Sequence, residues 1–411
     1  MRYTALLFFL VGCYSLAAGR EEPSPLPADT SVSIKYHAYV EGYKGRPIPF
    51  TVEVLESAKT ERIVIRNAAE RLVTDPFRKV GDSVFVTLPF FDAEFHLKQG
   101  DNGMDGYWVR HLPAGDRRYR LHLIQGYSPR FPSGEPAKVN VSGLWDMNFN
   151  GHHHSNVGYF TQDRTGRVTG SILSVSGDDR FLEGRVVGDS LFLSTFDGSH
   201  CYLYATRVNS RTQSLDSGHY YASANKPSNF TGTFNPGAKL EDVYTLTKMK
   251  PGVDSLSFRF KNLKGEEISY PNAQTYNKVT VIQFLGSWCP NCMDETAFLL
   301  DYQKKNPGKI SVIGLAYERS NDWVLSRNSV QKLVDRFGIP YPVLVTGYKN
   351  SNEEVLASMP QLANYEAFPT MILIDKKGKV QKIHTGFSGP GTGKFYTEFE
   401  KEFSDMVNAL Q

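Results

Sequence analysis

The hydrophobic positions divide the chain into two parts with different periodicity. From residue 33 to about residue 243, short segments alternate hydrophobic and polar positions, and Gly, Asp, Asn and Pro separate them. Alternation with a period of two is typical of strands with one buried face, and many short strands in succession indicate a sandwich or barrel. The sequence therefore predicts an all-β sandwich or barrel over residues 33–243. Its predicted strands are 33–40, 50–55, 62–65, 83–88, 93–97, 106–111, 119–124, 138–145, 157–161, 168–173, 190–196, 201–206 and 218–222.

After about residue 257, hydrophobic runs alternate with segments of helical spacing. The runs, which predict strands, lie at 279–284, 309–317, 342–345, 370–375 and 380–385. The segments of helical spacing lie at 294–304, 328–337, 353–359 and 395–410. This alternation predicts an α/β domain over residues 257–411, with a central sheet flanked by helices. Residues 244–256, which contain the pair Pro251-Gly252, are the predicted linker, and a second pair, Pro236-Gly237, lies shortly before it.

The first residues have the character of a secretory signal, because Arg2 precedes the apolar run 5–11. The run is too short to span a bilayer. Cleavage after the small residues 17–19 would remove a signal peptide covering 1–19. Alternatively, Leu-Val-Gly before Cys13 resembles a bacterial lipobox, and processing there would leave a lipid anchor on Cys13. Residues 20–32, rich in Ser and Pro, are the predicted tether.

Composition narrows the choice of partners only slightly. A net charge of +3 over 411 residues favours neither nucleic acid nor an acidic target. Four cysteines are too few for a disulfide scaffold. Cys201 lies in a strand-like segment, where we expect a buried structural thiol, with a third redox thiol as the alternative.

The chemically informative segment is Trp288 followed by Cys289-x-x-Cys292, between a hydrophobic run and a helical segment. A helix N-terminus stabilises a thiolate, the form that attacks disulfides, and two thiols at this spacing can cycle with a disulfide. A zinc site would need two further ligands, and no second Cys or His pair of suitable spacing accompanies this one. A purely structural disulfide is the other alternative, but such bridges usually close longer loops. The pattern favours redox chemistry without a metal or cofactor.

Residues 258–411 resemble the TlpA-like thioredoxin-fold thiol–disulfide oxidoreductases that work outside the bacterial cytoplasm. Four features carry the resemblance: the Trp288-Cys289-x-x-Cys292 motif, Glu295, Phe368-Pro369-Thr370, and the opening phrase at 258–265. It implies a thioredoxin fold for the C-terminal part and leaves the β part without a family.

The resemblance also implies roles for individual residues. Cys289 would be the exposed attacking thiol, and Cys292 the buried resolving thiol. Glu295 would be a buried carboxylate that tunes the pair, although an acid in the first turn of the predicted helix can also be solvated. Pro369 would be a cis-proline facing the disulfide, with an ordinary trans proline as the alternative. Trp288, Phe368 and Pro369 would contact the substrate.

One departure from the family pattern leaves the direction of electron flow open. Many of these reductases carry Pro directly before the second Cys, whereas here Pro290 follows the first and Asn291 precedes the second. The dipeptide sets the potential of the pair. Three hypotheses follow: a protein-disulfide reductase or isomerase, a disulfide-forming oxidase, and a non-enzymatic surface-binding adaptor with a vestigial thioredoxin domain. The intact Cys pair disfavours the adaptor.

The expected partners follow from the resemblance and from the absence of a flavin or nucleotide motif. The substrate would be a disulfide-bearing protein, with apocytochrome c as one class that the family suggests, and the donor a membrane-embedded thiol reductant. A periplasmic or other extracytoplasmic location is expected. In the β part, His152–His154, Phe196–His200 and Tyr220-Tyr221 are weak ligand candidates, better interpreted as an exposed loop, a hairpin turn and a strand end.

Overall fold

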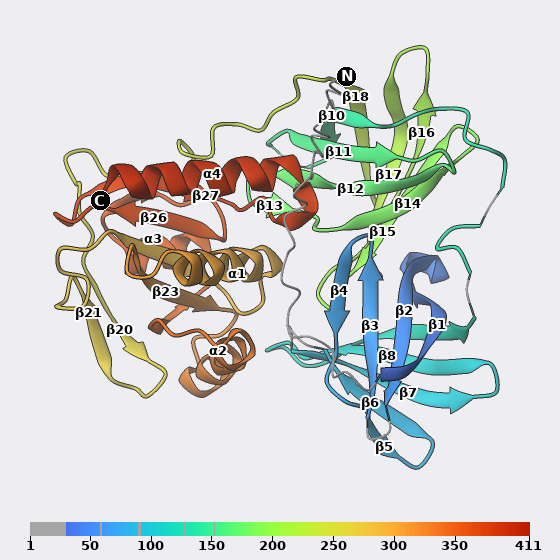
Figure 1. The fold of residues 1–411 in the computed structure, drawn as a ribbon, viewed down its shortest axis with the longest axis horizontal. Helices are drawn as coiled ribbons and strands as arrows, with labels where there is room; N and C mark the ends of the chain where they lie inside the picture. The colour runs from blue at the N-terminus through green and yellow to red at the C-terminus, as the bar shows by residue number, and fades with distance from the viewer. Residues whose placement is uncertain (1–29, 58–59, 89–91, 127, 133, 152) are drawn as a thin grey trace, which may run out of the picture.

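The computed structural model describes residues 30–57, 60–88, 92–126, 128–132, 134–151 and 153–411. The predicted signal, Cys13 and most of the predicted tether lie outside the described residues. Figure 1 shows three regions: an open sheet at lower right, a closed sheet at upper right and an α/β part at left. Among the described residues, no helix combines the length and apolar character needed to cross a bilayer.

The open sheet has nine strands in the order β4-β3-β2-β1-β9-β8-β7-β6-β5, and every pairing is antiparallel. Alternate residues of β2 turn one face of the sheet into a hydrophobic core, as the period of two predicts. The strands are β1 (Thr30–Glu41), β2 (Pro47–Ser57), β3 (Glu61–Asn67), β4 (Glu70–Val73), β5 (Arg78–Val80), β6 (Ser83–Thr87), β7 (Ala93–Gly100), β8 (Gly103–Arg110) and β9 (Arg117–Gln125), with the short helix η1 (Tyr43–Gly45) after β1.

The second sheet closes on itself, because β11 pairs with both β10 and β12. The result is an antiparallel barrel whose strands follow one another in chain order, with β13 as an appendage of β12. Aromatic and aliphatic side chains fill it. Its strands are β10 (Gly143–Phe149), β11 (Asn156–Gln162), β12 (Arg167–Ser174), β13 (Gly177–Asp178), β14 (Leu182–Val187), β15 (Ser190–Phe196), β16 (Cys201–Asn209), β17 (Ser214–Ala222) and β18 (Ser228–Phe234).

The all-β prediction is confirmed, and the structure adds that two sheets share it. They pack together through β2 and β15, where the Phe50 and Phe196 rings stack with centroids 4.3 Å apart. The predicted strand 138–145 was wrong at its start, because β10 begins at Gly143. The pattern also missed β4, β5, β13, β14 and β18.

The α/β part has a seven-stranded sheet in the order β21-β20-β24-β23-β22-β26-β27. Only β22, β23 and β24 run parallel, and the other pairings are antiparallel. A small sheet joins β19 to β25, so a strand of the stretch 244–256 packs onto this part. The elements are β19 (Lys248–Met249), β20 (Phe258–Asn262), β21 (Glu267–Tyr270), β22 (Thr280–Leu285), α1 (Pro290–Lys305), β23 (Ser311–Glu318), α2 (Trp323–Phe337), β24 (Val343–Lys349), α3 (Asn352–Ser358), β25 (Leu362–Asn364), β26 (Thr370–Ile374), β27 (Val380–Thr385), η2 (Pro390–Thr392) and α4 (Lys394–Ala409).

Both faces of this sheet are buried, as the continuous hydrophobic runs predict. Val281 and Leu285 of β22 join a core shared with α1, α2 and α4, whereas Ile282 and Phe284 join a second core with Val355 of α3. A mixed sheet covered on both faces by helices is the thioredoxin arrangement, so the predicted fold class of the C-terminal part is confirmed.

Candidate functional site

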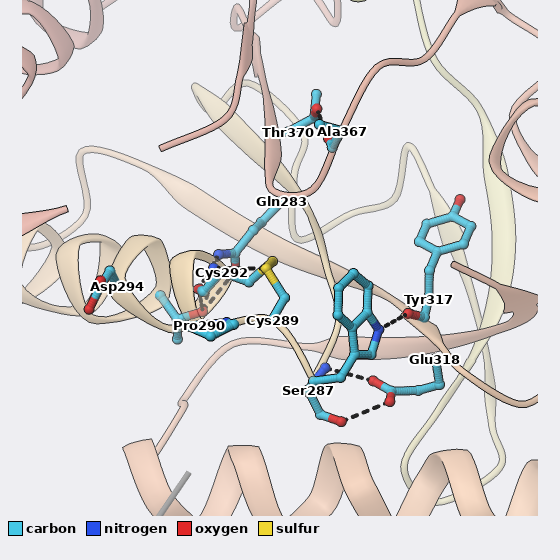
Figure 2. The surroundings of a disulfide bond; sticks show 12 residues. Gln283, Ser287, Cys289, Pro290, Cys292, Asp294, Tyr317, Glu318, Ala367 and Thr370 are labelled. Atoms are coloured by element: carbon cyan, nitrogen blue, oxygen red, sulfur yellow. Dashed lines mark hydrogen bonds between the residues drawn. A yellow bond between two sulfur atoms is a disulfide. The ribbon is translucent and has the colours of Figure 1, made fainter. Parts of the chain in front are cut away.

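The cysteine pair lies where β22 passes into α1. Every residue of β22 is buried, which fixes the point where the chain leaves the sheet. Cys289 is the N-cap of α1, and its sulfur accepts a hydrogen bond from the Cys292 amide at 3.2 Å. The two cysteines form a disulfide with Cα atoms 5.3 Å apart (Figure 2). A sulfur at this position faces the free N–H groups and the positive end of the helix dipole.

Two predictions about this segment were wrong. The helix begins at Pro290 rather than at residue 294, because proline is favoured in the first turn and its missing N–H costs nothing there. Asp294 and Glu295 consequently lie beyond the first turn. Cys289 is also not an exposed thiol: 5% of its surface is accessible, against 1% for Cys292.

Glu295 is completely buried, so it is not a solvated surface acid. Burial raises its pKa to about 8, because a low-dielectric surrounding disfavours the charged form. Neither carboxyl oxygen has a hydrogen-bond partner of good geometry among the described residues. At neutral pH this side chain is therefore mostly protonated, and it can exchange a proton within the buried region of α1.

A buried glutamine ties the helix to the strand beneath it. The Gln283 side-chain amide of β22 donates to the Cys292 carbonyl at 3.4 Å and to the Thr296 hydroxyl at 3.1 Å. The Thr296 hydroxyl in turn donates to the same Cys292 carbonyl at 2.8 Å. Gln283 was not among the predicted site residues, although a polar residue within an otherwise apolar strand was a usable signal. These bonds hold the first turns of α1 in place.

The segment before Cys289 is anchored to the end of β23. The Glu318 carboxylate accepts hydrogen bonds from the Ser287 amide at 2.8 Å and the Ser287 hydroxyl at 2.7 Å, as Figure 2 shows. Burial raises the pKa of Glu318, and these bonds partly offset the effect. The Trp288 indole donates to the Tyr317 carbonyl at 2.9 Å. Glu318 belongs to no local motif, because it approaches Ser287 only through the parallel pairing of β22 and β23.

The structure brings Phe368 and Pro369 to the same site. The peptide bond between them is cis. The Phe368 ring meets the Trp288 ring edge-on with centroids 5.6 Å apart, and both rings are partly buried. Pro369 itself is buried, and its carbonyl accepts a hydrogen bond from the Gly386 amide at 2.8 Å. Trp288 and Phe368 therefore form an aromatic wall next to the disulfide.

The remaining predicted residues lie outside this site. Cys201 is fully buried in β16, and burial raises the pKa of its thiol far above the usual value, so it is an inert core thiol. His154 pairs with Glu241 at 3.0 Å and Glu366 at 3.3 Å, whereas His152 is outside the described residues. Within the described part of the chain, no group of three His, Cys, Asp or Glu residues could hold a metal ion. The turn after β15 holds Asp197, which is buried rather than exposed.

The comparisons with known proteins concern the C-terminal part. Residues 250–399 match the family model described as Redoxin. The chain is 25% identical over 138 residues to "Thioredoxin-like protein YneN" of Bacillus subtilis, covering 34% of this chain and 73% of YneN. It is 27% identical over 144 residues to "Thiol-disulfide oxidoreductase ResA" of Geobacillus thermodenitrificans, covering 34% of this chain and 72% of ResA.

Solved structures give similar matches. A thiol:disulfide interchange protein of the thioredoxin family from Chlorobium tepidum matches 38% of this chain and 95% of its own, with 21% identity and a TM-score of 0.29. A thiol-disulfide oxidoreductase from Bacteroides fragilis matches 36% of this chain and 99% of its own, with 19% identity and a TM-score of 0.27.

Proposed function

We propose that the protein is an extracytoplasmic thiol–disulfide oxidoreductase that reduces or isomerises disulfides of other proteins through Cys289 and Cys292. The observation that carries this proposal is the position of the pair. Cys289 caps α1 with its sulfur at the helix N-terminus, and Cys292 lies one turn deeper under Gln283 and Thr296. The greater accessibility of Cys289 favours it as the attacking thiol.

The reaction has two exchange steps and needs no cofactor. The Cys289 thiolate attacks one sulfur of the substrate disulfide, that disulfide breaks, and the other substrate sulfur leaves as a thiolate that takes up a proton. The Cys292 thiolate then attacks the Cys289 sulfur of the mixed disulfide and releases the second substrate thiol. Two electrons pass to the substrate, and the enzyme ends with the Cys289–Cys292 disulfide seen in the structure.

We assign proton management during resolution to Glu295. Its raised pKa of about 8 lies near that of a thiol, so the carboxyl can exchange a proton as Cys292 changes its charge. Trp288 and Phe368 pack against the core that contains the cysteine pair, and we assign these two residues and Pro369 contact with the substrate polypeptide. The remaining half of the cycle needs a dithiol donor that reduces the disulfide again, and a membrane-embedded thiol reductant facing the same compartment is the proposed source.

The location and the substrate class rest on the N-terminal signal pattern and on the relatives. A secretory signal, or a lipid on Cys13, would place the catalytic pair outside the cytoplasm. There, apocytochrome c and other secreted proteins present disulfides that a reductase would open. We favour reduction over oxidation, because the resemblance to the TlpA-like reductases rests on Glu295 and the opening phrase of the domain as well as on the cysteines.

The test is catalysed reduction of insulin by a dithiol, followed by turbidity. The full chain should accelerate the reaction, and Cys289→Ser should remove the acceleration. Cys201→Ser serves as the matched control, since Cys201 is a buried thiol in the barrel, and this variant should keep the activity. Unaccelerated reduction by the folded wild-type chain would refute the proposed function.

A further inference from the structure

One segment of the β part that reaches the active site is the 175–180 hairpin, which covers Val175 to Arg180 and includes β13. Gly177 lies so close to Asn291, between the two cysteines, that a Cβ atom at Gly177 would be 2.0 Å from the Asn291 side-chain nitrogen. Gly386, next to the Pro369 carbonyl, approaches the Val175 carbonyl equally closely, at 2.3 Å from a Cβ position. The hairpin therefore packs against the peptide between the two cysteines and against the loop that is hydrogen-bonded to Pro369.

Arg180 ends this hairpin and extends onto the active-site helix. One terminal nitrogen of its guanidinium is 2.6 Å from the Asp294 carboxylate of α1 and donates to the Pro290 carbonyl at 3.3 Å. The other terminal nitrogen is 2.6 Å from Glu70, at the start of β4. The Arg180 side chain is 9% exposed. One buried cation thus joins the open sheet, the barrel and the peptide that follows Cys289.

The backbone of the hairpin is built to hold this cation. Arg180 has a φ of +57°, a left-handed conformation that residues other than glycine rarely adopt. The Asp178 carboxylate stabilises this conformation, because one of its oxygens accepts a hydrogen bond from the Arg180 amide at 2.5 Å. Its other oxygen accepts a hydrogen bond from the Gly389 amide of the α/β part at 2.7 Å. The arrangement is therefore fixed from both sides of the interface.

The charges around Arg180 are mostly negative. Besides Asp294 and Glu70, the buried Asp197 lies 3.6 Å away, and Asp197 itself pairs with His200 at 3.1 Å. Burial raises the pKa of Asp294 to about 7, although Arg180 opposes that shift. Removal of the guanidinium would leave these carboxylates facing the first turns of α1 without their common counter-ion.

We propose that Arg180, supplied by the β part, is a positioning residue for the redox pair: it fixes the start of α1 and raises the reduction potential of Cys289–Cys292, with Asp294 acting in the opposite direction. This inference rests on the proposed function. A cation beside the first turn of α1 stabilises the thiolate and hence the reduced dithiol over the neutral disulfide. The β part therefore completes the active site rather than serving only as an anchor.

The measurement is equilibration of the full chain with glutathione, in which the protein disulfide and two glutathione molecules give the protein dithiol and oxidised glutathione. Arg180→Met should shift the equilibrium three- to tenfold toward the disulfide, roughly 15 to 30 mV more negative. Asp294→Asn should shift it in the opposite direction, and Arg180→Lys should restore part of the wild-type value.

Arg130→Met is the matched control. Arg130 is also a buried arginine of the β part, but its hydrogen bonds go to Asn67, Ser194 and Arg66 within that part. The reduction potential of the Arg130→Met variant should equal that of the wild type. Asp294→Asn keeps the test decisive if Arg180→Met does not fold, because Asp294 lies on α1 outside the β part. Shifts of the same sign in Arg180→Met and Asp294→Asn, or none in either, would overturn the inference. Failure of the wild type to equilibrate would instead count against the proposed function.

Discussion

Adjacent residues of α1 show how strongly local surroundings decide the role of a carboxyl group. Asp294 meets Arg180 at 2.6 Å, whereas Glu295 is buried without a hydrogen-bond partner of good geometry among the described residues. Burial raises the pKa of both, to about 7 and about 8. Asp294 thus forms an ion pair with Arg180 of the β part, whereas Glu295 is the buried carboxyl group to which we assign proton exchange.

Glu295→Gln should lower the apparent pKa for alkylation of the reduced cysteine pair. In the wild type the carboxyl group ionises near pH 8, and its negative charge then opposes formation of a nearby thiolate. Glutamine removes this charge while keeping the shape of the side chain. The measurement is the rate of iodoacetamide alkylation from pH 5 to pH 10. A profile identical to that of the wild type would contradict a coupling between Glu295 and the thiols.

The same substitution should change how stability depends on pH. The folded protein keeps Glu295 protonated up to about pH 8, whereas the unfolded chain loses that proton near its ordinary pKa of 4.5. Between these values the folded state binds more protons, so stability falls as pH rises. Urea unfolding of Glu295→Gln should therefore show a smaller loss of stability between pH 5 and pH 8 than the wild type. An equal or steeper loss would contradict the raised pKa.

At this scale the sequence predicts only those residues that belong to a local motif. Cys289, Cys292 and Pro369 stand in recognisable phrases, and the structure brings them to one site. Arg180 and Glu318 could not be found in this way, because each reaches the site through folding of distant segments. The prediction that Cys289 is exposed was wrong for the same reason, because its burial depends on segments that are distant in the sequence.

Among the elements, α1 determines the chemistry and α4 supports it. The Pro290-Asn291 turn lets Cys289 cap the helix, which favours the thiolate. We therefore predict a reduction potential above about −270 mV, the thioredoxin value, by glutathione equilibration. A value near about −120 mV would promote the oxidase alternative over the reductase.

Phe403→Ala should destabilise the protein by about 3–5 kcal/mol, because Phe403 of α4 is completely buried and packs edge-on against Phe298 of α1. The measurement is urea unfolding followed by circular dichroism. Lys401→Ala on the exposed face of the same helix is the control, and it should stay within about 0.5 kcal/mol of the wild type. A comparable loss of unfolding free energy in both variants would contradict a specific stabilising role of the Phe403 contact with α1.

Periodicity predicted the types of element better than their ends. The start of α1 was missed because the helix opens on a Cys-Pro-Asn-Cys segment with no helical spacing of hydrophobic residues. β14 and β18 were missed because each carries a glycine in mid-strand, at Gly184 and Gly232. These glycines are explained by close packing, since a Cβ at Gly184 would lie 1.8 Å from the Phe192 carbonyl.

Across the whole molecule, the α/β part has cores of its own, and it also depends on the β part at the active site. Its two main cores draw only on residues after 248. A smaller cluster joins barrel residues Leu144, Val157 and Leu173 to Phe395 of α4. The division into an all-β and a thioredoxin-fold part was thus predictable from the sequence. The contact between the two parts at the active site was not predictable, because it forms only when folding brings the 175–180 hairpin next to α1.

A fragment covering residues 252–411 should fold and reduce a small disulfide such as oxidised glutathione. Its reduction potential should nevertheless be more negative than that of the wild type, because the fragment lacks the guanidinium beside Pro290. Circular dichroism and glutathione equilibration measure the two properties. A folded fragment with the wild-type potential would mean that the β part has no influence on the pair.

The most direct test of the account is capture of mixed disulfides by the full-length protein. Cys292→Ser removes the resolving thiol, so Cys289 should remain covalently bound to substrate proteins in an extracytoplasmic extract. Dithiothreitol should reduce these mixed disulfides and dissociate the complexes. Cys289→Ser, tested in parallel, should capture none. Complexes formed by Cys289→Ser instead would reverse the assigned roles, and their absence from both folded variants would contradict a disulfide-exchange function.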